Sequence, residues 1–566
     1  MKKILNSNWA ILIVLLFSVI PILPFFHPGF FPMHDDTQPS RVFEMAQSLR
    51  DGMFPVRWVK DLGYGYGYPI FNFYAPLPYY IGGLLHLVGI DVIVATKVMM
   101  AIPIFIAGIT MFLFAREFLG KIGALVSSII FLFFPYFALN LFVRGAVGEA
   151  WAYSFLPLVF LGIFKLYGQK TVSIKWILFT SVAISLVTLS HNLSAYMLIL
   201  LWLILIIILL VFSKYKVHLV QNVFAVVFLT FLLSAFYTIP AIFEMSYTNV
   251  SSQIGGGANF QDHFVCLGQL WNSQWGYGGS TSGCIDGMSF KLGKSNVVFS
   301  VLSIILGIYL FIKRKEKKDI PFFSSVVLLL FTLFMTLSYS VMVWSSVAYI
   351  EYLQYPWRFL NFAGFFIAFL VGYGVCVVAK LTNLKITVVF CLLIVTITIY
   401  INAKHFQPQA YNQKTPKDYT NEKTLRFNIS KISDEYMPRG FQKPENALFT
   451  PQNSERLVLL NLWSRGSLSI IENKTQYVAA KVKTEKEANI RANIAYFPAW
   501  KAYIDKKRVD YKVTDGPLIL TVESGLHFVE FKFEQTPVER WANALSLVGI
   551  GILLVGIIRI YGKKTS

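Results

Sequence analysis

The sequence predicts a polytopic α-helical membrane protein with a β-rich domain near its C-terminal end. Apolar runs long enough to cross a hydrocarbon core recur along most of the 566 residues. Only 14% of the residues are charged, whereas soluble proteins average about 25%, and the mean hydropathy is +0.57. Between residues 402 and 540 the pattern changes to short alternating segments that are typical of β-strands.

Twelve apolar segments are predicted to cross the membrane. The first follows a charged start at residues 1–3, as in a signal peptide, but no small-x-small cleavage site comes after it. We therefore expect it to remain as the first span. The predicted spans are 9–26, 92–115, 122–140, 151–166, 174–190, 194–212, 219–240, 296–312, 320–338, 358–379, 385–401 and 541–560.

Basic residues between the spans predict the orientation of the chain. With the amino terminus in the cytoplasm, every basic cluster between spans falls on the cytoplasmic side, and the strongest is 313–318. The apolar stretch 77–88 is short and begins beside prolines, so we expect an interfacial helix there, because a crossing would invert every later loop. These loops account for much of the formal charge of +20, and no nucleic-acid partner is expected.

The predicted organisation has three parts. Residues 1–401 form a transmembrane core with outside loops at 27–91 and 241–295, residues 402–540 form an extracytoplasmic β-rich domain, and residues 541–566 form the last span and a cytoplasmic tail. Near residue 530 apolar and charged side chains alternate, and Asp515-Gly516 is predicted to form a turn. The pattern predicts a β-sandwich of about seven strands, which is either a lid or spacer or a domain that handles substrate.

Four cysteines are spread unequally along the chain. Cys266 and Cys284 fall in the outside loop 241–295, whereas Cys376 and Cys391 lie within spans. Two thiols on an oxidising side favour a disulfide between Cys266 and Cys284, which would stabilise the fold by roughly 2–3 kcal/mol. The cysteine spacing does not indicate a zinc site.

Ionisable residues gather at the outer ends of the predicted spans. Asp35 and Asp36 are adjacent, so one takes a raised pKa unless a cation or metal compensates; alternatively, they cap a helix that starts near Thr37. Several such residues at one depth favour an interfacial cavity. They are His34, Asp35, Asp36, Arg41, Glu44, Arg57, Asp61, Arg144, Glu149, His191, Glu244, Glu351, Gln354 and Arg358.

Aromatic residues are dense in the first outside loop, among glycines and prolines. They either form an aromatic belt at the membrane interface or offer a platform for sugar rings, whose apolar faces stack on aromatic side chains. They are Tyr64, Tyr66, Tyr68, Phe71, Phe73, Tyr74, Tyr79 and Tyr80.

Several motifs are distributed over most of the chain. They are His34-Asp35-Asp36, Arg41, GMFPVRW at 52–58, Gly63-Tyr64-Gly65, FYAPLPY at 73–79, RGAVGEA at 144–150, QYPWRF at 354–359 and YFPAWKAYID at 496–505. In these motifs the chain resembles the bacterial YfhO-like and related integral membrane proteins of the GT-C glycosyltransferase class. Some related proteins carry a label naming a pterin synthase, which no motif here supports.

The resemblance implies a helical GT-C core that acts on a polyprenyl-phosphate-linked sugar, in the plasma membrane of a bacterium. It places an acidic residue in the first outside loop. Many class members have Asp-Glu where this chain has Asp35-Asp36, so the matching carboxylate stays open. Related sequences have His where this chain has Gln38. We therefore predict no cofactor, although a divalent metal stays open.

The resulting hypothesis is an inverting glycosyltransferase with an extracytoplasmic site. Asp35 is expected to act as the general base with Asp36 assisting, and Arg144, Arg358 and His191 are expected to bind the donor phosphate. The expected partners are the lipid-linked sugar donor, a glycan or glycolipid acceptor, and membrane lipids. The residues expected to bind substrate are His34, Arg57, Tyr64, Tyr74, Glu149 and Gln354.

Two other functions stay open. A transporter or flippase of a polar lipid would place its site at the bilayer midplane between related repeats, and we find no internal repeat and few charges within the spans. A catalytically inactive scaffold that displays the outer domain is the other alternative.

Overall fold

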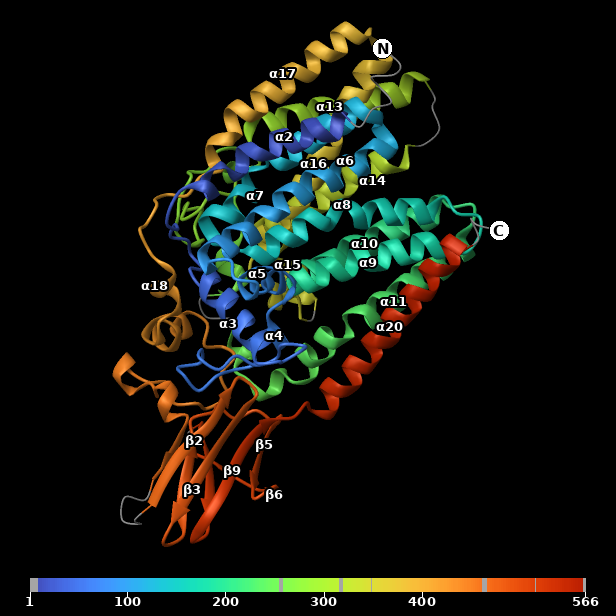
Figure 1. The fold of residues 1–566 in the computed structure, drawn as a ribbon. Coiled ribbons are helices and arrows are strands. Elements are labelled where there is room, and N and C mark those ends of the chain that lie inside the picture. Colours follow the sequence, from blue (N-terminus) through green and yellow to red (C-terminus); the bar gives the residue numbers. More distant parts are fainter. Residues whose placement is uncertain are drawn as a thin grey trace.

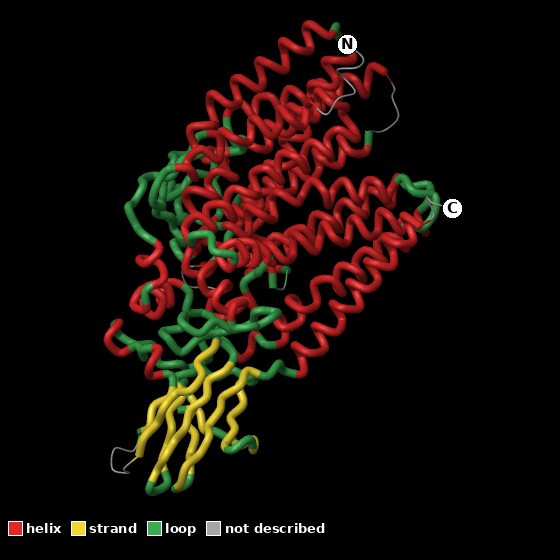
Figure 2. Tube along the Cα trace, in the orientation of Figure 1, coloured by secondary structure: helices red, strands yellow, loops and turns green. Residues whose placement is uncertain are grey.

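The computed structural model describes residues 9–253, 258–314, 319–347, 349–460, 466–514 and 516–562. A bundle of long helices makes up most of the molecule, and the strands project from one end of it (Figures 1 and 2). The polytopic helical core and the C-terminal β-rich part that the sequence predicts are both confirmed. The charged start at 1–3, the part of the basic cluster at 315–318 and Asp515 of the predicted turn lie outside the described residues.

Each of the twelve predicted spans coincides with helical structure. Within the described ranges, nine helices are long and apolar enough to cross a membrane, and α9 and α14 are shorter apolar helices. Together these eleven helices are α2 (Trp9–Ile22), α6 (Val92–Leu132), α8 (Val147–Tyr167), α9 (Ile174–Ser190), α10 (Asn192–Phe212), α11 (Lys216–Phe243), α13 (Lys294–Arg314), α14 (Ile320–Thr336), α16 (Leu360–Leu381), α17 (Leu384–Asn402) and α20 (Pro537–Gly562).

Helix α6 covers the predicted span 92–115 and most of the predicted span 122–140. The end of the second span lies in α7 (Pro135–Leu139) and at the start of η2 (Asn140–Arg144). Gly120 divides α6, because its φ of 69° and ψ of −174° are not helical. The expected short cytoplasmic loop is thus a sharp kink. The glycine permits this conformation because it has no Cβ.

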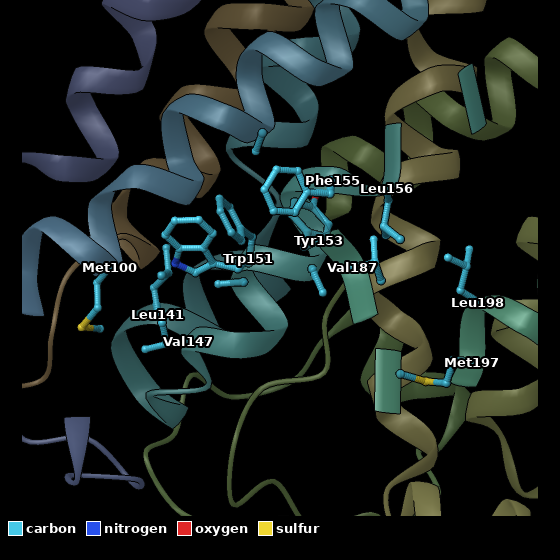
Figure 3. Packing of buried hydrophobic residues seen from close by; sticks show 14 of the residues in the cluster. Met100, Leu141, Val147, Trp151, Tyr153, Phe155, Leu156, Val187, Met197 and Leu198 are labelled. Carbon is cyan, nitrogen blue, oxygen red and sulfur yellow. The ribbon is translucent and has the colours of Figure 1, made fainter. Parts of the chain in front are cut away.

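Helix α8 lies at the centre of the bundle and is buried on all sides. A helix that is apolar all round belongs in such a core. By contrast, α20 lies at the periphery and exposes Leu547 and Val555, as expected for a lipid-facing helix. The side chains labelled in Figure 3 show the packing around α8: Met100, Leu141, Val147, Trp151, Tyr153, Phe155, Leu156, Val187, Met197 and Leu198.

Short helices of the first outside loop lie between the bundle and the strands (Figure 1). They are α3 (Gln38–Arg50), α4 (Ile70–Phe73) and α5 (Leu77–Leu87). Helix α5 occupies the stretch predicted as an interfacial helix. The other short helices are α12 (Leu267–Trp271), α15 (Val341–Ser346), α18 (Pro416–Thr420) and α19 (Ser430–Ile432).

Two antiparallel sheets form the β-rich part, with strand orders β1-β4-β8-β7 and β2-β3-β9-β5-β6. In the larger sheet Ala480 lies opposite Val529 and Val478 opposite Phe531, and all four are buried. The strands are β1 (Leu457–Leu459), β2 (Gly466–Lys474), β3 (Tyr477–Thr484), β4 (Ala488–Ala492), β5 (Trp500–Ile504), β6 (Lys507–Val509), β7 (Lys512–Val513), β8 (Leu518–Val522) and β9 (Gly525–Phe533).

The predicted alternation in β9 holds for Val529 and Phe531, which are buried, but Glu530 on the opposite face is buried as well. Its carboxylate accepts a hydrogen bond from the Tyr477 hydroxyl at 2.7 Å and pairs with Lys532 at 2.9 Å. These local partners therefore offset the cost of burying the Glu530 carboxylate, which the alternation alone would place in solvent.

The first outside loop also joins the helical core to the sheets. Trp58 is fully buried and packs edge-on against Trp500 of β5, with ring centroids 5.6 Å apart. Asp51 accepts hydrogen bonds from the backbone N–H and the hydroxyl of Thr475, at 2.6 and 2.7 Å. These contacts place the strands at the end of the bundle where the loop lies. The start of α2 and the end of α20 lie at the opposite end (Figure 1).

Candidate functional site

A cavity of about 550 Å³ lies where the helical core, the first outside loop and the segment 432–436 meet. Its wall brings together side chains from helices and loops that are far apart in the sequence. The predicted site residues that line it are His34, Asp35, Tyr74, Arg144, Glu149, His191, Gln354 and Arg358. Asp36, Arg57 and Tyr64 are not among its lining residues.

Backbone hydrogen bonds hold the loop after the first span against the end of η2. The N–H groups of His34 and Asp35 donate to the carbonyl oxygens of Val143 and Arg144, each at 2.9 Å. Gly145 follows with a φ of 70°, and a Cβ there would lie 2.4 Å from the sulfur of Met33. Glycine at this position therefore allows the loop to lie close against the end of η2, which brings Asp35 beside Arg144.

Glu149, in the first turn of α8, joins the two arginines. Its Oε1 lies 2.8 Å from Nη2 of Arg144 and 3.2 Å from Nε of Arg358, while its Oε2 accepts a second hydrogen bond from Arg144 at 2.9 Å. Tyr136 and Asn361 also donate to Oε2, at 3.3 and 3.1 Å. One buried carboxylate thus holds two guanidinium groups, and this triad keeps one net positive charge.

Aromatic rings and Gln354 complete the support of the arginines. Arg144 lies over the ring of Trp357 at 4.4 Å, and Arg358 over that of Tyr355 at 4.8 Å. Such cation–π contacts fix the planes of the guanidinium groups. Gln354 accepts a hydrogen bond from Nη1 of Arg358 at 3.1 Å, so its carbonyl oxygen supports that arginine.

His191 caps the start of α10. Its Nδ1 accepts a hydrogen bond from the backbone N–H of Ser194 at 3.1 Å, so Nδ1 carries the lone pair and Nε2 carries the proton. A neutral N–H donor is therefore part of the cavity wall. Gly148 of α8 allows this arrangement, because a Cβ there would lie 2.5 Å from the carbonyl oxygen of Ser190.

Asp35 carries a charge in the cavity wall. Burial raises the pKa of this carboxyl, but the hydrogen bond from His34 at 2.9 Å and the charges of His34, Arg144 and Arg41 outweigh burial and hold the pKa below its usual range. The same hydrogen bond raises the pKa of His34. A carboxylate stabilised as an anion beside cations is thus present at neutral pH.

Asp36 points away from the cavity toward the segment after α17. It pairs with Nζ of Lys414 at 2.8 Å and accepts a hydrogen bond from the Tyr419 hydroxyl at 3.2 Å. Burial raises its pKa, and these partners oppose that shift. The two carboxylates do not cap α3, because their side chains bond to His34 and Lys414 instead. The N-cap residue of α3 is Thr37, and its side chain makes no capping hydrogen bond.

Arg57 lies in a buried polar network between the first outside loop, α11 and α20. It donates to Asn72 and Asn543, each at 2.8 Å, and its Nε lies 3.6 Å from Oε1 of Glu539. Asn72 in turn donates to Glu244 at 3.2 Å. This network joins elements that are distant in the sequence.

Most of the aromatic side chains of the first loop are buried, so their ring faces are not open to solvent. Tyr64 is 2% exposed and donates its hydroxyl to Asp434 at 2.9 Å. Tyr68 is hydrogen-bonded to Ser433 at 3.2 Å, and Phe73 stacks on Tyr436. These rings hold the segment 433–436 against the cavity.

Two charged residues line the cavity without having been assigned a role from the sequence. Arg41 belongs to α3, and its signals in the sequence were its place in the loop cluster and among the motifs of the resemblance. Glu435 comes from the part predicted as a separate domain, and no pattern in the sequence connects it with Asp35. Gln38, by contrast, is used structurally, since it donates to the carbonyl oxygen of Gly145 at 2.8 Å and accepts from Tyr79 at 2.6 Å.

The loop after α11 supplies another part of the cavity wall. Cys266 and Cys284 form a disulfide, with their Cα atoms 5.6 Å apart. The closed loop carries Gly278, Gly279 and Ser280, which line the cavity. In the portion of the chain that the structure describes, no cluster of three or more His, Cys, Asp or Glu side chains is arranged to hold a metal ion.

These features define a polytopic membrane protein with a charged cavity. The cavity lies at the end of the helical bundle that is next to the sheets. A family model described as "6-pyruvoyl-tetrahydropterin synthase related domain; membrane protein" matches residues 71–261. A protein of Lactococcus lactis subsp. cremoris strain MG1363, described as an uncharacterized protein, is 24% identical over 171 residues, which are 29% of this chain and 28% of that protein.

Solved structures are similar at low sequence identity. The oligosaccharyltransferase of Archaeoglobus fulgidus in its apo form is 13% identical, with a TM-score of 0.48 over 76% of this chain and 60% of that one. The arabinofuranosyltransferase AftD from Mycobacteria is 12% identical, with a TM-score of 0.46 over 71% of this chain and 27% of that one. The matches span less than two thirds of each of these proteins.

Proposed function

We propose that this chain is a membrane glycosyltransferase that transfers a sugar from a polyprenyl-phosphate-linked donor to a cell-envelope polymer or glycolipid. The observation that carries the proposal is a single cavity lined both by Asp35 and by the cationic triad of Arg144, Arg358 and Glu149. It combines a proton acceptor with a binding site for a leaving phosphate. We further propose that the enzyme is inverting, YfhO-like and of the GT-C type.

In the proposed reaction, the oxygen of an acceptor hydroxyl attacks the anomeric carbon of the donor sugar. The bond between that carbon and the phosphate oxygen breaks as the new glycosidic bond forms on the opposite face. The hydroxyl proton passes to Asp35, and the electron pair of the broken bond leaves with the polyprenyl phosphate. Oδ1 of Asp35 accepts the hydrogen bond from His34, so we assign Oδ2 to the proton.

The cationic triad suits a phosphate leaving group. Guanidinium groups bind phosphate oxygens through parallel N–H donors, and Arg144 and Arg358 are held by Glu149 and by aromatic rings. The net positive charge of the triad would be balanced by the departing phosphate. We assign the Nε2–H of His191 as a further donor to that phosphate, and Glu149 and Gln354 as positioning residues.

We also propose where the reaction takes place. The cavity would open at the outer face of a bacterial plasma membrane, with residues 402–540 extracytoplasmic and residues 541–566 forming the last span and a cytoplasmic tail. The segment 432–436 contributes to the cavity wall, which favours a role in handling substrate over one as a spacer. A flexible lipid tail would remain in the bilayer while its phosphate reaches the triad.

The test uses the purified full chain, reconstituted in vesicles with a radiolabelled sugar on a polyprenyl phosphate. We expect the label to appear on an added glycolipid or, more slowly, as free sugar, with release of polyprenyl phosphate. A flippase would move the intact donor across the bilayer without breaking it, and an inactive scaffold would do neither. Intact donor after prolonged incubation with a panel of glycolipids would contradict the proposal.

A further inference from the structure

The cavity is also lined by a second group of polar and charged side chains, separate from the arginine triad and called here the second wall. It is formed by Arg41 of α3, Tyr74 of the first loop, and Ser433, Glu435 and Tyr436 of the segment before the sheets. The proposed reaction assigns no role to these residues. They nevertheless bring a guanidinium group, a carboxyl group and two aromatic rings to one cavity.

Arg41 is buried to an unusual degree for a cation at such a wall. It is 4% exposed, and its guanidinium lies 4.4 Å over the ring of Tyr74. Within the described part of the chain, its Nε has no hydrogen-bond partner. A buried guanidinium N–H without an acceptor is costly, so an acceptor oxygen supplied by a ligand would be favourable here.

Glu435 lines the same cavity, and the two residues before it are anchored to the first loop. Its neighbour Asp434 accepts the hydroxyl of Tyr64, and Ser433 is bonded to Tyr68. Burial raises the pKa of Glu435, while the nearby charge of Arg41 acts against that shift. The buried tyrosines of the first loop therefore position this carboxyl at the cavity.

The two walls differ in their charged groups. In the triad two guanidinium groups share the carboxylate of Glu149, which leaves one excess positive charge, whereas Arg41 has the carboxyl group of Glu435 near it as a single counterpart. Asp35 is close enough to both groups that the charges of Arg144 and Arg41 both act on it. A phosphate suits the first wall. A balanced pair of donor and acceptor groups beside Tyr74 and Tyr436 suits a neutral ligand with many hydroxyl groups.

We propose that the wall formed by Arg41, Tyr74, Glu435 and Tyr436 binds the acceptor, and that this acceptor is an uncharged sugar rather than a phosphorylated or acidic one. The inference rests on the proposed function. The carboxylate of Glu435 accepts hydrogen bonds from two sugar hydroxyls, the guanidinium of Arg41 donates to a third oxygen, and the tyrosine rings contact the apolar face of the sugar. The reacting hydroxyl then faces Asp35.

The test compares Glu435→Gln with Asp434→Asn, a matched carboxylate-to-amide change at the adjacent position. Two acceptors are used: an uncharged diacylglycerol-linked disaccharide, and the same lipid bearing a charged glycerol phosphate. We expect Glu435→Gln to raise the KM for the neutral acceptor by about ten- to a hundredfold, as for the loss of charge-assisted hydrogen bonds. Binding of polyprenyl phosphate and slow donor hydrolysis should be unchanged.

The control should keep its acceptor KM, because an amide oxygen at position 434 still accepts the hydroxyl of Tyr64. An unchanged KM in Glu435→Gln, an equal rise in the control, or a preference of the wild type for the phosphorylated acceptor would overturn the inference. If the wild type neither transfers nor hydrolyses the donor, the proposed function fails. Equilibrium binding of the neutral glycolipid to wild type and Glu435→Gln then still decides the inference.

Discussion

The backbone N–H of Asp35 donates a hydrogen bond to the carbonyl oxygen of Arg144, and the two atoms are 2.9 Å apart. The proposed base and a proposed phosphate ligand are thus joined through the main chain, although they follow different spans. A main-chain link holds their separation more tightly than a contact between two flexible side chains would. Substitution of either side chain therefore leaves the link intact, which makes the site suitable for mutational tests.

The first prediction concerns the general base. Asp35→Asn keeps the size of the side chain but cannot accept the proton, so we expect the transfer rate to fall about 10²–10⁴-fold with donor binding retained. Asp36→Asn is the matched control, and its rate should fall much less because Asp36 bonds to Lys414 and Tyr419 outside the cavity. A folded Asp35→Asn protein with near-normal turnover would remove Asp35 from the mechanism.

The second prediction concerns the donor phosphate. Arg358→Gln removes one of the two guanidinium groups on Glu149, so we expect the KM for the lipid-linked donor to rise by about tenfold or more while that for the acceptor changes little. Arg439→Gln is the control, since Arg439 is exposed and bonds to Thr248. Steady-state kinetics with each substrate varied in turn provide the measurement. A larger effect on the acceptor would place Arg358 elsewhere in the mechanism.

The third prediction concerns pH. Transfer requires ionised Asp35, so the rate falls as the pH drops through the pKa of this carboxyl, which lies below its usual range. His34→Asn removes the hydrogen bond and the charge that lower that pKa, while burial continues to raise it. The acid limb of the rate–pH profile should therefore move to higher pH.

The control for this shift is His527→Asn. His527 makes a similar bond to Asp505 at 2.7 Å, but in the β-rich part and not at the cavity. Its removal should leave the acid limb in place. Superimposable profiles for His34→Asn and wild type would show that the ionisation of Asp35 does not set the acid limb.

The fourth prediction concerns the disulfide. Thiol labelling of unfolded, non-reduced protein should reach Cys376 and Cys391 but neither Cys266 nor Cys284, and Cys266→Ser should expose Cys284. Because the bridge closes a loop with a sequence separation of 18, its loss should lower the free energy of unfolding by about 3 kcal/mol. Cys376→Ser is the control for the substitution itself. Equal labelling with and without reductant would show that the bridge does not form in the protein.

The fifth prediction concerns orientation in the membrane. Reporters fused at Lys170 or near Lys315 should report the cytoplasm, whereas reporters at Pro408 or Gly516 should report the outside. Residues 168–173, the start of α2 and the end of α20 lie away from the strands (Figure 1), which agrees with this expectation. A cytoplasmic signal at Pro408 would contradict both the topology and the location of the proposed site.

Several parts of the site could be predicted because they depend on depth in the bilayer. Asp35, Arg144, His191 and Arg358 each stand at the outer end of a predicted span, and the cavity brings them together. The depth of a residue in the bilayer does not determine the direction in which its side chain points, however. Asp36 is adjacent to Asp35, yet it bonds to Lys414, and Arg57 reaches Glu539 of the last helix rather than the cavity.

The sequence by itself determined the spans, the β-rich part and the common depth of the ionisable residues. Partition into a bilayer and strand alternation depend on local composition, which can be read along the chain. Tertiary structure decided that Glu149 holds both arginines, that the tyrosines of the first loop support the segment 433–436, and that Arg41 and Glu435 line the same cavity as Asp35. These relationships depend on how helices and loops distant in the sequence pack together, and no local pattern encodes that packing.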